Sequence, residues 1–292
     1  MVFDGRGDPL PPRDRPCPAD WSNNALTGSC LGHSTVLMNF FGVRVITDPV
    51  FSKRVGLGIA PFVLGPKRYL KPAVQLREIP PPDVIVISHS HFDHLDRPSL
   101  RKFSRDTPVI TARGTADLLK HFRVVHELGW GESITLTVRG RPFQVSAIEV
   151  AHWGARMIRD EHRGYNGYLL ERNGHRVCFA GDTACTPAFA QLKSQSPDLM
   201  LMPIGAYDPG FGRTVVRSKL SRWRTTQAES ILSRSITRHS NSARSRWMSR
   251  HGGSSQRSRV NRSDFSPSTS VKPSASQHRE ALTGICSIRN LW

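Results

Sequence analysis

The chain lacks the cysteine pattern of a disulfide-bonded secreted protein. Its five cysteines are an odd number, they are widely scattered, and no two are spaced as Cys-x-x-Cys, so we expect reduced thiols. It also lacks any run of the roughly 18 apolar residues that a membrane-spanning helix needs, and its first residues include no apolar stretch typical of a secretory signal. These absences favour a soluble, cytoplasmic protein.

Acidic residues are scarce in one part of the chain. Residues 211–292 contain 16 Lys and Arg but only 3 Asp and Glu, together with 19 Ser, and their apolar residues follow no sustained period. Most of the net charge of +18 therefore belongs to this segment and says little about residues 1–210. We predict that 211–292 is a basic, Ser/Arg-rich tail of low complexity that is mostly disordered.

The remaining sequence predicts short strands and helices in alternation. Residues 1–20 are rich in Pro, Asp and Arg and predict an irregular arm, whereas the apolar runs 34–40 and 43–47 flank a Phe-Gly pair and predict a hairpin. Residues 51–72 have no periodicity and predict a long loop. Further strands are expected at 83–88, 108–111, 123–127, 134–138, 142–150, 165–171, 176–180 and 199–203, and helices at 98–103, 114–120 and 187–193. Several strands are joined too briefly for crossover helices, which favours mixed sheets covered by helices.

The most informative stretch for chemistry is Ser88-His89-Ser90-His91-Phe92-Asp93-His94. From His89 to His94 it places three histidines and one carboxylate within six residues. It directly follows the apolar, β-branched run Val84–Ile87, which predicts a buried strand. A buried strand ends rigidly, so the turn after it can direct several side chains toward one point. Neutral imidazole and carboxylate are ligands of zinc and related divalent metals, so the stretch predicts a metal site.

Two residues farther along the chain also follow expected strands. His152 comes after the apolar run 143–150, and Asp182 comes after 177–180 and one glycine, which lets the backbone approach closely. Each could be an ordinary residue at the end of a strand. Together with the first cluster, both are predicted to be metal ligands.

The pattern His89-x-His91-x-Asp93-His94 after a strand resembles the signature of the metallo-β-lactamase superfamily. Other segments, in order over residues 20–210, resemble its branch that contains the N-acyl-phosphatidylethanolamine phospholipase D enzymes and many bacterial hydrolases of unclear substrate. These segments are Leu31-Gly32-His33-Ser34-Thr35-Val36, Thr47-Asp48-Pro49, Gly65-Pro66-Lys67-Arg68-Tyr69, His152-Trp153, Phe179-Ala180-Gly181-Asp182-Thr183 and Pro203-Ile204-Gly205-Ala206-Tyr207-Asp208-Pro209.

The resemblance implies an α/β (α+β) fold: an αββα sandwich over residues 21–210, with two zinc ions in a cleft at one edge of the sheets. It also implies an enzyme, a hydrolase in which a hydroxide shared by the two metals attacks phosphorus or a carbonyl. The ligands that it implies are His89, His91 and His152 for one ion and Asp93 and His94 for the other, with Asp182 as the bridge.

The roles of several other residues stay open. His33 either lines the site, where it would be catalytic with Asp93 and Asp182, or caps the hairpin. Asp48 either orients a ligand histidine or is simply the turn residue before a proline, and the turn is favoured. Four histidines are expected to have no catalytic role: His121, His126, His162 and His175.

The loop 51–72 offers a candidate substrate contact. Its residues Lys67, Arg68 and Tyr69 either bind an anionic substrate or lie in a solvated loop. Because the loop mixes apolar and basic residues, it could also rest on a membrane surface as a peripheral contact.

The resemblance also implies a helix and a strand after Pro209, ending in a histidine that completes the second metal site. His239 has about the right separation, but its neighbours are Arg, Ser and Asn rather than a buried apolar strand. We therefore predict one tightly bound metal and a second that is held loosely or not at all. The abrupt change of composition is also what an altered reading frame would produce.

The leading functional hypothesis is a zinc-dependent hydrolase that cleaves a phosphodiester in a small or lipid-like anionic substrate, as a phospholipase D does. A lactonase or esterase of the same fold is a close second, and a catalytically impaired metal-binding remnant is a third. Nucleic-acid binding by the basic tail is disfavoured, because the tail has few aromatic residues to stack on bases and no recognised module.

Overall fold

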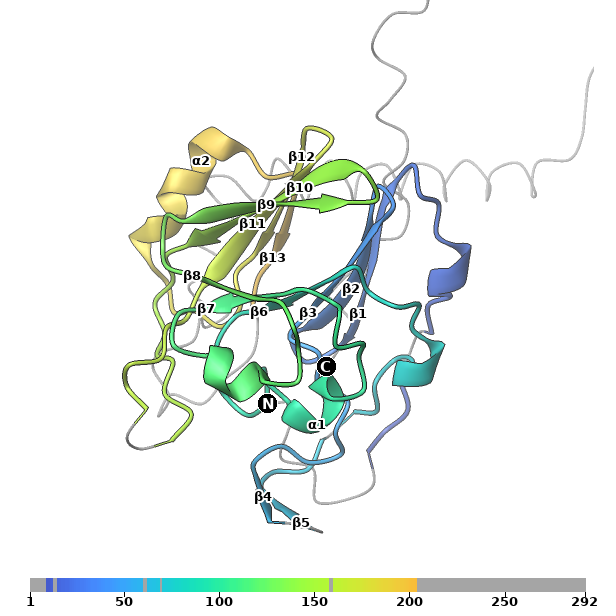
Figure 1. The fold of residues 1–292 in the computed structure, drawn as a ribbon, viewed down its shortest axis with the longest axis vertical. Helices are drawn as coiled ribbons and strands as arrows, with labels where there is room; N and C mark the ends of the chain where they lie inside the picture. The colour runs from blue at the N-terminus through green and yellow to red at the C-terminus, as the bar shows by residue number, and fades with distance from the viewer. Residues whose placement is uncertain (1–8, 13–14, 60–61, 69, 158–159, 204–292) are drawn as a thin grey trace, which may run out of the picture. The chain divides into compact units, whose positions relative to one another are not determined.

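Two facing β-sheets build the fold in the computed structural model, which describes residues 9–12, 15–59, 62–68, 70–157 and 160–203 (Figure 1). All of these residues belong to one compact unit. The six-stranded sheet has the order β1 (Leu26–Gly32), β2 (Thr35–Phe40), β3 (Val43–Thr47), β6 (Val84–Ile87), β7 (Val109–Ala112) and β8 (Val125–Leu128). The five-stranded sheet has the order β13 (Leu199–Leu201), β12 (His175–Phe179), β11 (Gly167–Arg172), β10 (Arg141–Ile148) and β9 (Ser133–Val138).

Strand direction changes within each sheet. In the larger sheet β1, β2 and β3 form an antiparallel meander, and β3, β6, β7 and β8 run parallel. In the smaller sheet β9 to β12 are antiparallel and β13 is parallel to β12. Because β3 and β6 are parallel neighbours, their carboxyl ends lie side by side at one edge of the sheet.

The short helices lie around these sheets. Figure 1 shows α1 (Arg97–Leu100) and α2 (Leu192–Gln195) on opposite sides of the two sheets. The described residues also contain four 3₁₀ turns: η1 (Pro18–Asp20), η2 (Leu76–Glu78), η3 (Ala116–Leu119) and η4 (Pro187–Gln191). The two-sheet fold with outer helices confirms the predicted fold class, although the helices are shorter than the sequence suggested.

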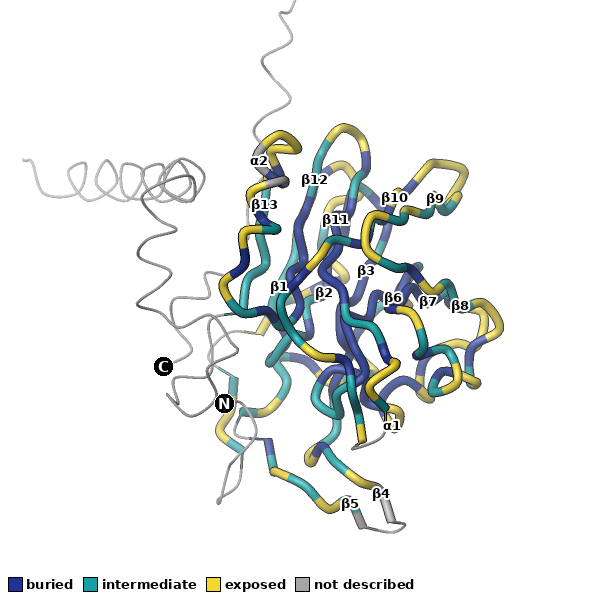
Figure 2. Tube along the Cα trace, turned by 90° about the vertical axis from the view of Figure 1, so that its left-hand side faces the viewer, coloured by how far each residue is buried: buried dark blue, intermediate teal, exposed yellow. Residues whose placement is uncertain are grey.

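Strand β6 is buried on both faces, and this explains its continuous apolar sequence. Val84 and Val86 join the core between the sheets, which includes Phe143 of β10. Ile85 and Ile87 face the other way, into a second core beneath α1. Figure 2 shows the central strands as mostly buried and the connecting loops as exposed. The turn after β6 therefore starts from a firmly packed strand.

Two strand assignments differ from the sequence prediction. The segment 51–72 is not wholly irregular, because it contains the short hairpin of β4 (Leu57–Ile59) and β5 (Phe62–Leu64). The hairpin needs Gly56, since a Cβ built there would lie 2.0 Å from the carbonyl oxygen of Leu64. Strand β1 was not predicted, because Leu-Thr-Gly-Ser-Cys-Leu-Gly has little strand propensity; its pairing with β2 creates it.

The domain boundaries at 20 and 210 stay predictions, and the tail 211–292 lies outside the described residues. Among the residues that are described, no helix has the length and apolar character to cross a membrane. A cytoplasmic location stays a prediction as well.

Candidate metal centre

The turn that follows β6 carries four of the candidate ligands, and its backbone is held from both sides. The carbonyl of Ser88 accepts a hydrogen bond from the Asn166 amide at 2.9 Å, and the Ser88 amide donates to Oδ1 of Asp48 at 2.7 Å. The turn then folds back, because the amide of His94 donates to the carbonyl of His91 at 3.1 Å. These hydrogen bonds hold the backbone of the turn, and the sequence predicts such a held turn directly after a buried strand.

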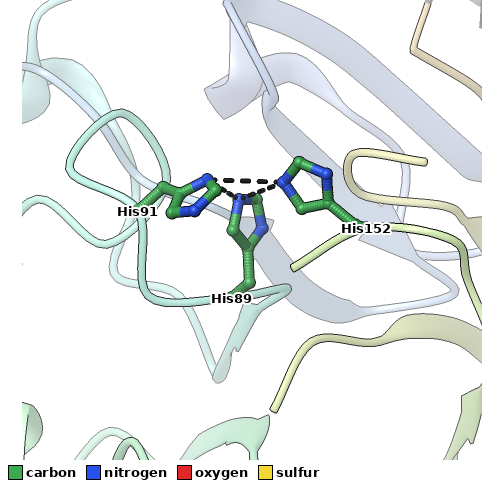
Figure 3. A group of neighbouring side chains, drawn as sticks. All are labelled: His89, His91 and His152. Carbon is green, nitrogen blue, oxygen red and sulfur yellow. Dashed lines mark hydrogen bonds between the residues drawn. The ribbon is translucent and has the colours of Figure 1, made fainter. Parts of the chain in front are cut away.

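Three imidazoles meet beside this turn (Figure 3). Nε2 of His89 lies 2.9 Å from Nδ1 of His91 and 3.2 Å from Nε2 of His152, and the last two atoms are 3.3 Å apart. Each nitrogen is either a donor or an acceptor, so in a triangle at least two must have the same role and repel each other. A cation at the centre removes this conflict, because it accepts all three lone pairs. We call His89, His91 and His152 the first group.

A second group lies beside the first and contains His33, Asp93, His94 and Asp182. Nε2 of His94 is 3.2 Å from Nε2 of His33 and 3.3 Å from Oδ2 of Asp182. Oδ2 of Asp93 is 3.1 Å from Nε2 of His33 and 3.9 Å from Nε2 of His94. Asp182 also shares a potential ligand cluster with His89 of the first group, with all ligand atoms within 4.8 Å of one another. Its carboxylate therefore lies between the two groups.

These separations fit metal coordination. Two ligands at about 2.0–2.1 Å from a tetrahedral zinc ion are about 3.3 Å apart. The contacts of the first group run from 2.9 to 3.3 Å and those of the second from 3.1 to 3.9 Å. Imidazole nitrogen and carboxylate oxygen suit zinc and several other divalent metals. The side chains present therefore fit two adjacent divalent ions.

Burial favours the neutral form of all three histidines in the first group. Burial lowers the pKa of His89 well below the ordinary histidine value, since charging a ring away from water is costly. Burial also lowers the pKa of His91, and it lowers that of His152 to about 4. Neutral rings keep a free lone pair, which is the form that binds a metal.

In the second group, the surroundings of His94, Asp93 and Asp182 favour the charged form of each. Burial by itself would lower the pKa of His94, but the Asp182 and Asp93 carboxylates outweigh burial and hold that pKa well above the ordinary value. Burial likewise opposes ionisation of the two carboxyls, yet His94 lowers the pKa of Asp182 to about 2 and, with His33, lowers the pKa of Asp93. Two ionised carboxylates attract a cation, and a metal at Nε2 of His94 would replace the proton there.

Asp48 fixes the orientation of His94. Its Oδ2 lies 2.7 Å from Nδ1 of His94 and accepts a hydrogen bond from the Ser88 hydroxyl at 2.6 Å, and the Asp48 side chain is fully buried. The bond at Nδ1 leaves Nε2 facing the second group. Asp48 also directly follows β3, with a positive φ of 34°, so it is both the turn residue that the sequence favoured and an orienting partner. One signal could have revealed this orienting role: Asp48 directly follows β3, whose end lies beside the end of β6 at one edge of the sheet.

The comparisons with known proteins agree with this geometry. Residues 43–232 match the family described as the beta-lactamase superfamily domain. This chain belongs to the beta-lactamase superfamily. The match confirms the family that the histidine motif predicted, and it extends past residue 210, where the motif resemblance ends.

Two relatives within the superfamily are similar in sequence. The chain is 33% identical over 202 residues to N-acyl-phosphatidylethanolamine-hydrolyzing phospholipase D 1 of Caenorhabditis elegans, covering 64% of this chain and 56% of that protein. It is 33% identical over 189 residues to the mitochondrial N-acyl-phosphatidylethanolamine-hydrolyzing phospholipase D of Saccharomyces cerevisiae, covering 61% and 40%. The chain thus spans about half the length of the curated relatives that it matches.

Solved structures of similar fold are more distant in sequence. A possible metal-dependent hydrolase from Veillonella parvula superimposes with a TM-score of 0.53 at 16% identity, covering 69% of this chain and 81% of that one. An isothiocyanate hydrolase from Delia radicum gut bacteria has a TM-score of 0.52 at 14% identity, covering 69% and 78%. These likenesses support the superfamily fold.

Arg156 is a supporting residue of the centre that the sequence did not suggest. Its Nη1 donates to the carbonyls of Ser90 at 2.6 Å and Leu95 at 2.9 Å, and its guanidinium lies 3.9 Å from the centre of the Phe92 ring. The Ser90 hydroxyl also donates to the Gly154 carbonyl at 2.6 Å. These contacts attach the segment that carries His152 to the turn after β6.

The structure describes two of the three predicted substrate contacts. Arg68 is buried with 1% of its surface exposed, and its Nη2 donates to the carbonyl of Val50 at 2.6 Å. It borders a cavity of about 390 Å³ that Lys53 and Lys71 also line. Lys67 forms an isolated bridge with Arg54 and is half-buried, and Tyr69 lies outside the described residues. Substrate binding by these residues stays a prediction.

Four further histidines of the described residues belong to neither group. Nε2 of His121 is 3.0 Å from the carbonyl oxygen of Phe103, and His175 stacks on Phe41 with ring centres 4.8 Å apart. His126 and His162 belong to no potential ligand cluster of the described residues. His239 lies outside the described part of the chain, so its role as the final ligand stays a prediction.

Proposed function

We propose that this protein is a hydrolase that uses two divalent metal ions, with zinc as the expected metal. The first group binds one ion, Asp93 and His94 bind the other, and Asp182 bridges them. The observation that carries the proposal is the position of Asp182, whose carboxylate shares a ligand cluster with His89 of the first group and His94 of the second. A bridging carboxylate is typical of paired ions about 3.5–4 Å apart.

The residues around the ions have separable tasks. When bound, the ions lower the pKa of a coordinated water to about 7 and offset the negative charge that develops on substrate oxygen. Asp48 and Ser88 keep the ring of His94 in place. The Asp93 side chain is 36% exposed, so the second group is open to solvent and to a substrate. Trp153 is 40% exposed and its ring lies 5.0 Å from that of His91, which places an apolar surface beside the metals.

The substrate that fits best is a phosphodiester with a lipid-like group. Two relatives are named for the hydrolysis of N-acyl-phosphatidylethanolamine. Lys53, Arg68 and Lys71 surround one cavity and offer positive charge for an anionic group. Leu57 and Leu64 of the β4–β5 hairpin are 47% and 61% exposed, and they provide an apolar contact for a lipid surface.

Turnover by the full chain tests the proposal. The protein is stripped with a chelator, reloaded with zinc, and assayed with N-acyl-phosphatidylethanolamine, bis(4-nitrophenyl) phosphate and a lactone series. We expect zinc-dependent cleavage of the phosphodiesters and a loss of about 10²-fold or more in Asp182→Asn, because the bridge between the ions is weakened. His126→Ala, a histidine outside both groups, should match the wild type.

Two other outcomes of this assay would each lead to a different conclusion. Cleavage of lactones alone would replace the phosphodiesterase with a lactonase of the same fold. Tight zinc binding with no turnover of any substrate class would contradict the proposal and leave a catalytically impaired metal-binding protein.

A further inference from the structure

His33 occupies a left-handed backbone position, which few residues other than glycine adopt. It follows Gly32 in the tight connection between β1 and β2, and its φ is +53°. Glycine adopts such positions without strain, whereas a residue with a Cβ is strained there; asparagine, aspartate and histidine are the other types that occur there most often. Strain of this kind persists where the surrounding structure over-determines it, which is common at functional sites.

The side chain of His33 turns inward, toward Asp93 and His94. Only 17% of it is exposed, and its Nε2 lies 3.1 Å from Oδ2 of Asp93 and 3.2 Å from Nε2 of His94. The ring of His33 meets that of His94 edge-on, with centres 4.8 Å apart. A cap of the hairpin would require none of these contacts.

We propose that His33 is a ligand of the second metal ion. The inference rests on the proposed two-metal function. Its Nε2 completes a four-donor set with Asp93, His94 and the bridging Asp182. The closest contacts within this set, 3.1 to 3.3 Å, are near the separation of about 3.3 Å that ligands of a tetrahedral zinc ion have.

This assignment changes the expectation for the second ion. The sequence resemblance takes the last ligand from a histidine after residue 209, and His239 was its best candidate. The described residues already provide four donors without that region. The second ion therefore binds through the β1–β2 turn, and its retention does not depend on His239.

Metal retention and spectroscopy test the assignment independently of turnover. His33→Asn removes the imidazole while keeping a residue that tolerates positive φ, and His33→Gly leaves space for free imidazole. His126→Ala is the matched control, and His239→Ala tests the alternative ligand. Each full-length protein is titrated with zinc by calorimetry, dialysed for metal analysis, and loaded with Co²⁺ to record the visible absorption of its sites.

We expect wild type, His126→Ala and His239→Ala to retain about two equivalents of zinc. Both His33 variants should bind the second equivalent at least about 100-fold more weakly, because loss of a direct ligand exceeds the 10- to 100-fold effect of outer partners. The Co²⁺ spectrum of the second site should change, and added imidazole should restore it in His33→Gly.

The opposite results separate two failures. If wild type binds two ions and the His33 variants keep the same affinity and Co²⁺ spectrum, His33 is not a ligand, although the proposed function stands. If His239→Ala loses the second ion and the His33 variants keep it, the conclusion is the same: His33 is not a ligand, although the proposed function stands. If wild type itself binds a single ion, both the two-metal function and this assignment fail.

Discussion

Asp48 directly follows β3 and contacts His94, which lies in the turn after the neighbouring strand β6. Its carboxylate accepts bonds from the Ser88 amide and hydroxyl and contacts Nδ1 of His94. The partners in these three contacts are the ring of His94 and the neutral amide and hydroxyl of Ser88. At the residue scale, the metal centre therefore relies on one buried side chain that is not itself a ligand.

Replacement of Asp48 by asparagine should weaken the second metal site. The amide side chain in Asp48→Asn keeps the volume but cannot accept all three contacts, so His94 loses its fixed orientation. We expect zinc affinity at that site to fall about 10- to 100-fold, measured by competition with a chromophoric chelator. Asp106→Asn is the matched control, because Asp106 is exposed and pairs with Arg123 in a surface ion pair. Equal affinity in both variants would show that Asp48 does not orient the ligand.

At the scale of elements, the connection after β12 depends on close contact with the turn after β6. Gly181 precedes Asp182 and has a φ of +57°, and a Cβ built there would lie 2.6 Å from Cβ of Ser88. A glycine is required for both reasons. Its small size is what lets Asp182, from the five-stranded sheet, reach the candidate ligands of the six-stranded sheet.

Gly181→Ala should therefore lower both stability and metal retention. The positive φ costs about 1–2 kcal/mol for a side chain, and the contact with Ser88 adds about 1–3 kcal/mol. Gly140→Ala is a matched control, since its φ is +73° but no described atom lies within 4 Å of an added Cβ. In urea denaturation, Gly140→Ala should lower the free energy of unfolding only by the cost of the positive φ, about 1–2 kcal/mol. If the two variants are equally stable, the contact with Ser88 is readily relieved.

At the scale of the whole molecule, the candidate metal centre draws its residues from both sheets. The turns after β1 and β6 belong to the six-stranded sheet, whereas His152 follows β10 and Asp182 follows β12 of the five-stranded sheet. The Ala151 amide also donates to the Thr183 hydroxyl at 3.0 Å, which links the last two segments. Bound metal should therefore stabilise the packing of one sheet on the other.

Removal of metal should lower the thermal stability of the full chain. Zinc at about 100 times its dissociation constant adds about 2.7 kcal/mol per site to the free energy of unfolding, if the unfolded chain does not bind it. We expect a chelator to lower Tm and zinc to restore it, as measured by calorimetry. The double variant His89→Ala/His94→Ala should have a Tm that zinc does not change. An unchanged wild-type Tm despite confirmed metal removal would contradict a link between the sheets.

The local sequence predicted the parts of the centre that depend on one strand and its following turn. The β-branched run before Ser88 predicted β6, and the spacing of His89, His91, Asp93 and His94 predicted a metal site after it. The local sequence did not predict β1, whose conformation comes from pairing with β2. It also undervalued Asp48, because its contact with His94 joins residues 46 positions apart.

The sequence by itself determined the superfamily, because closely spaced histidines after a strand are a local property of the chain, and the two-sheet fold followed from that resemblance. It also predicted the types of candidate ligand. Only the tertiary structure decided which side chains share one centre. His33 was left open between a turn cap and a site residue, since distance along the chain does not reveal distance in space. Folding places its Nε2 3.2 Å from Nε2 of His94, across 61 positions of sequence.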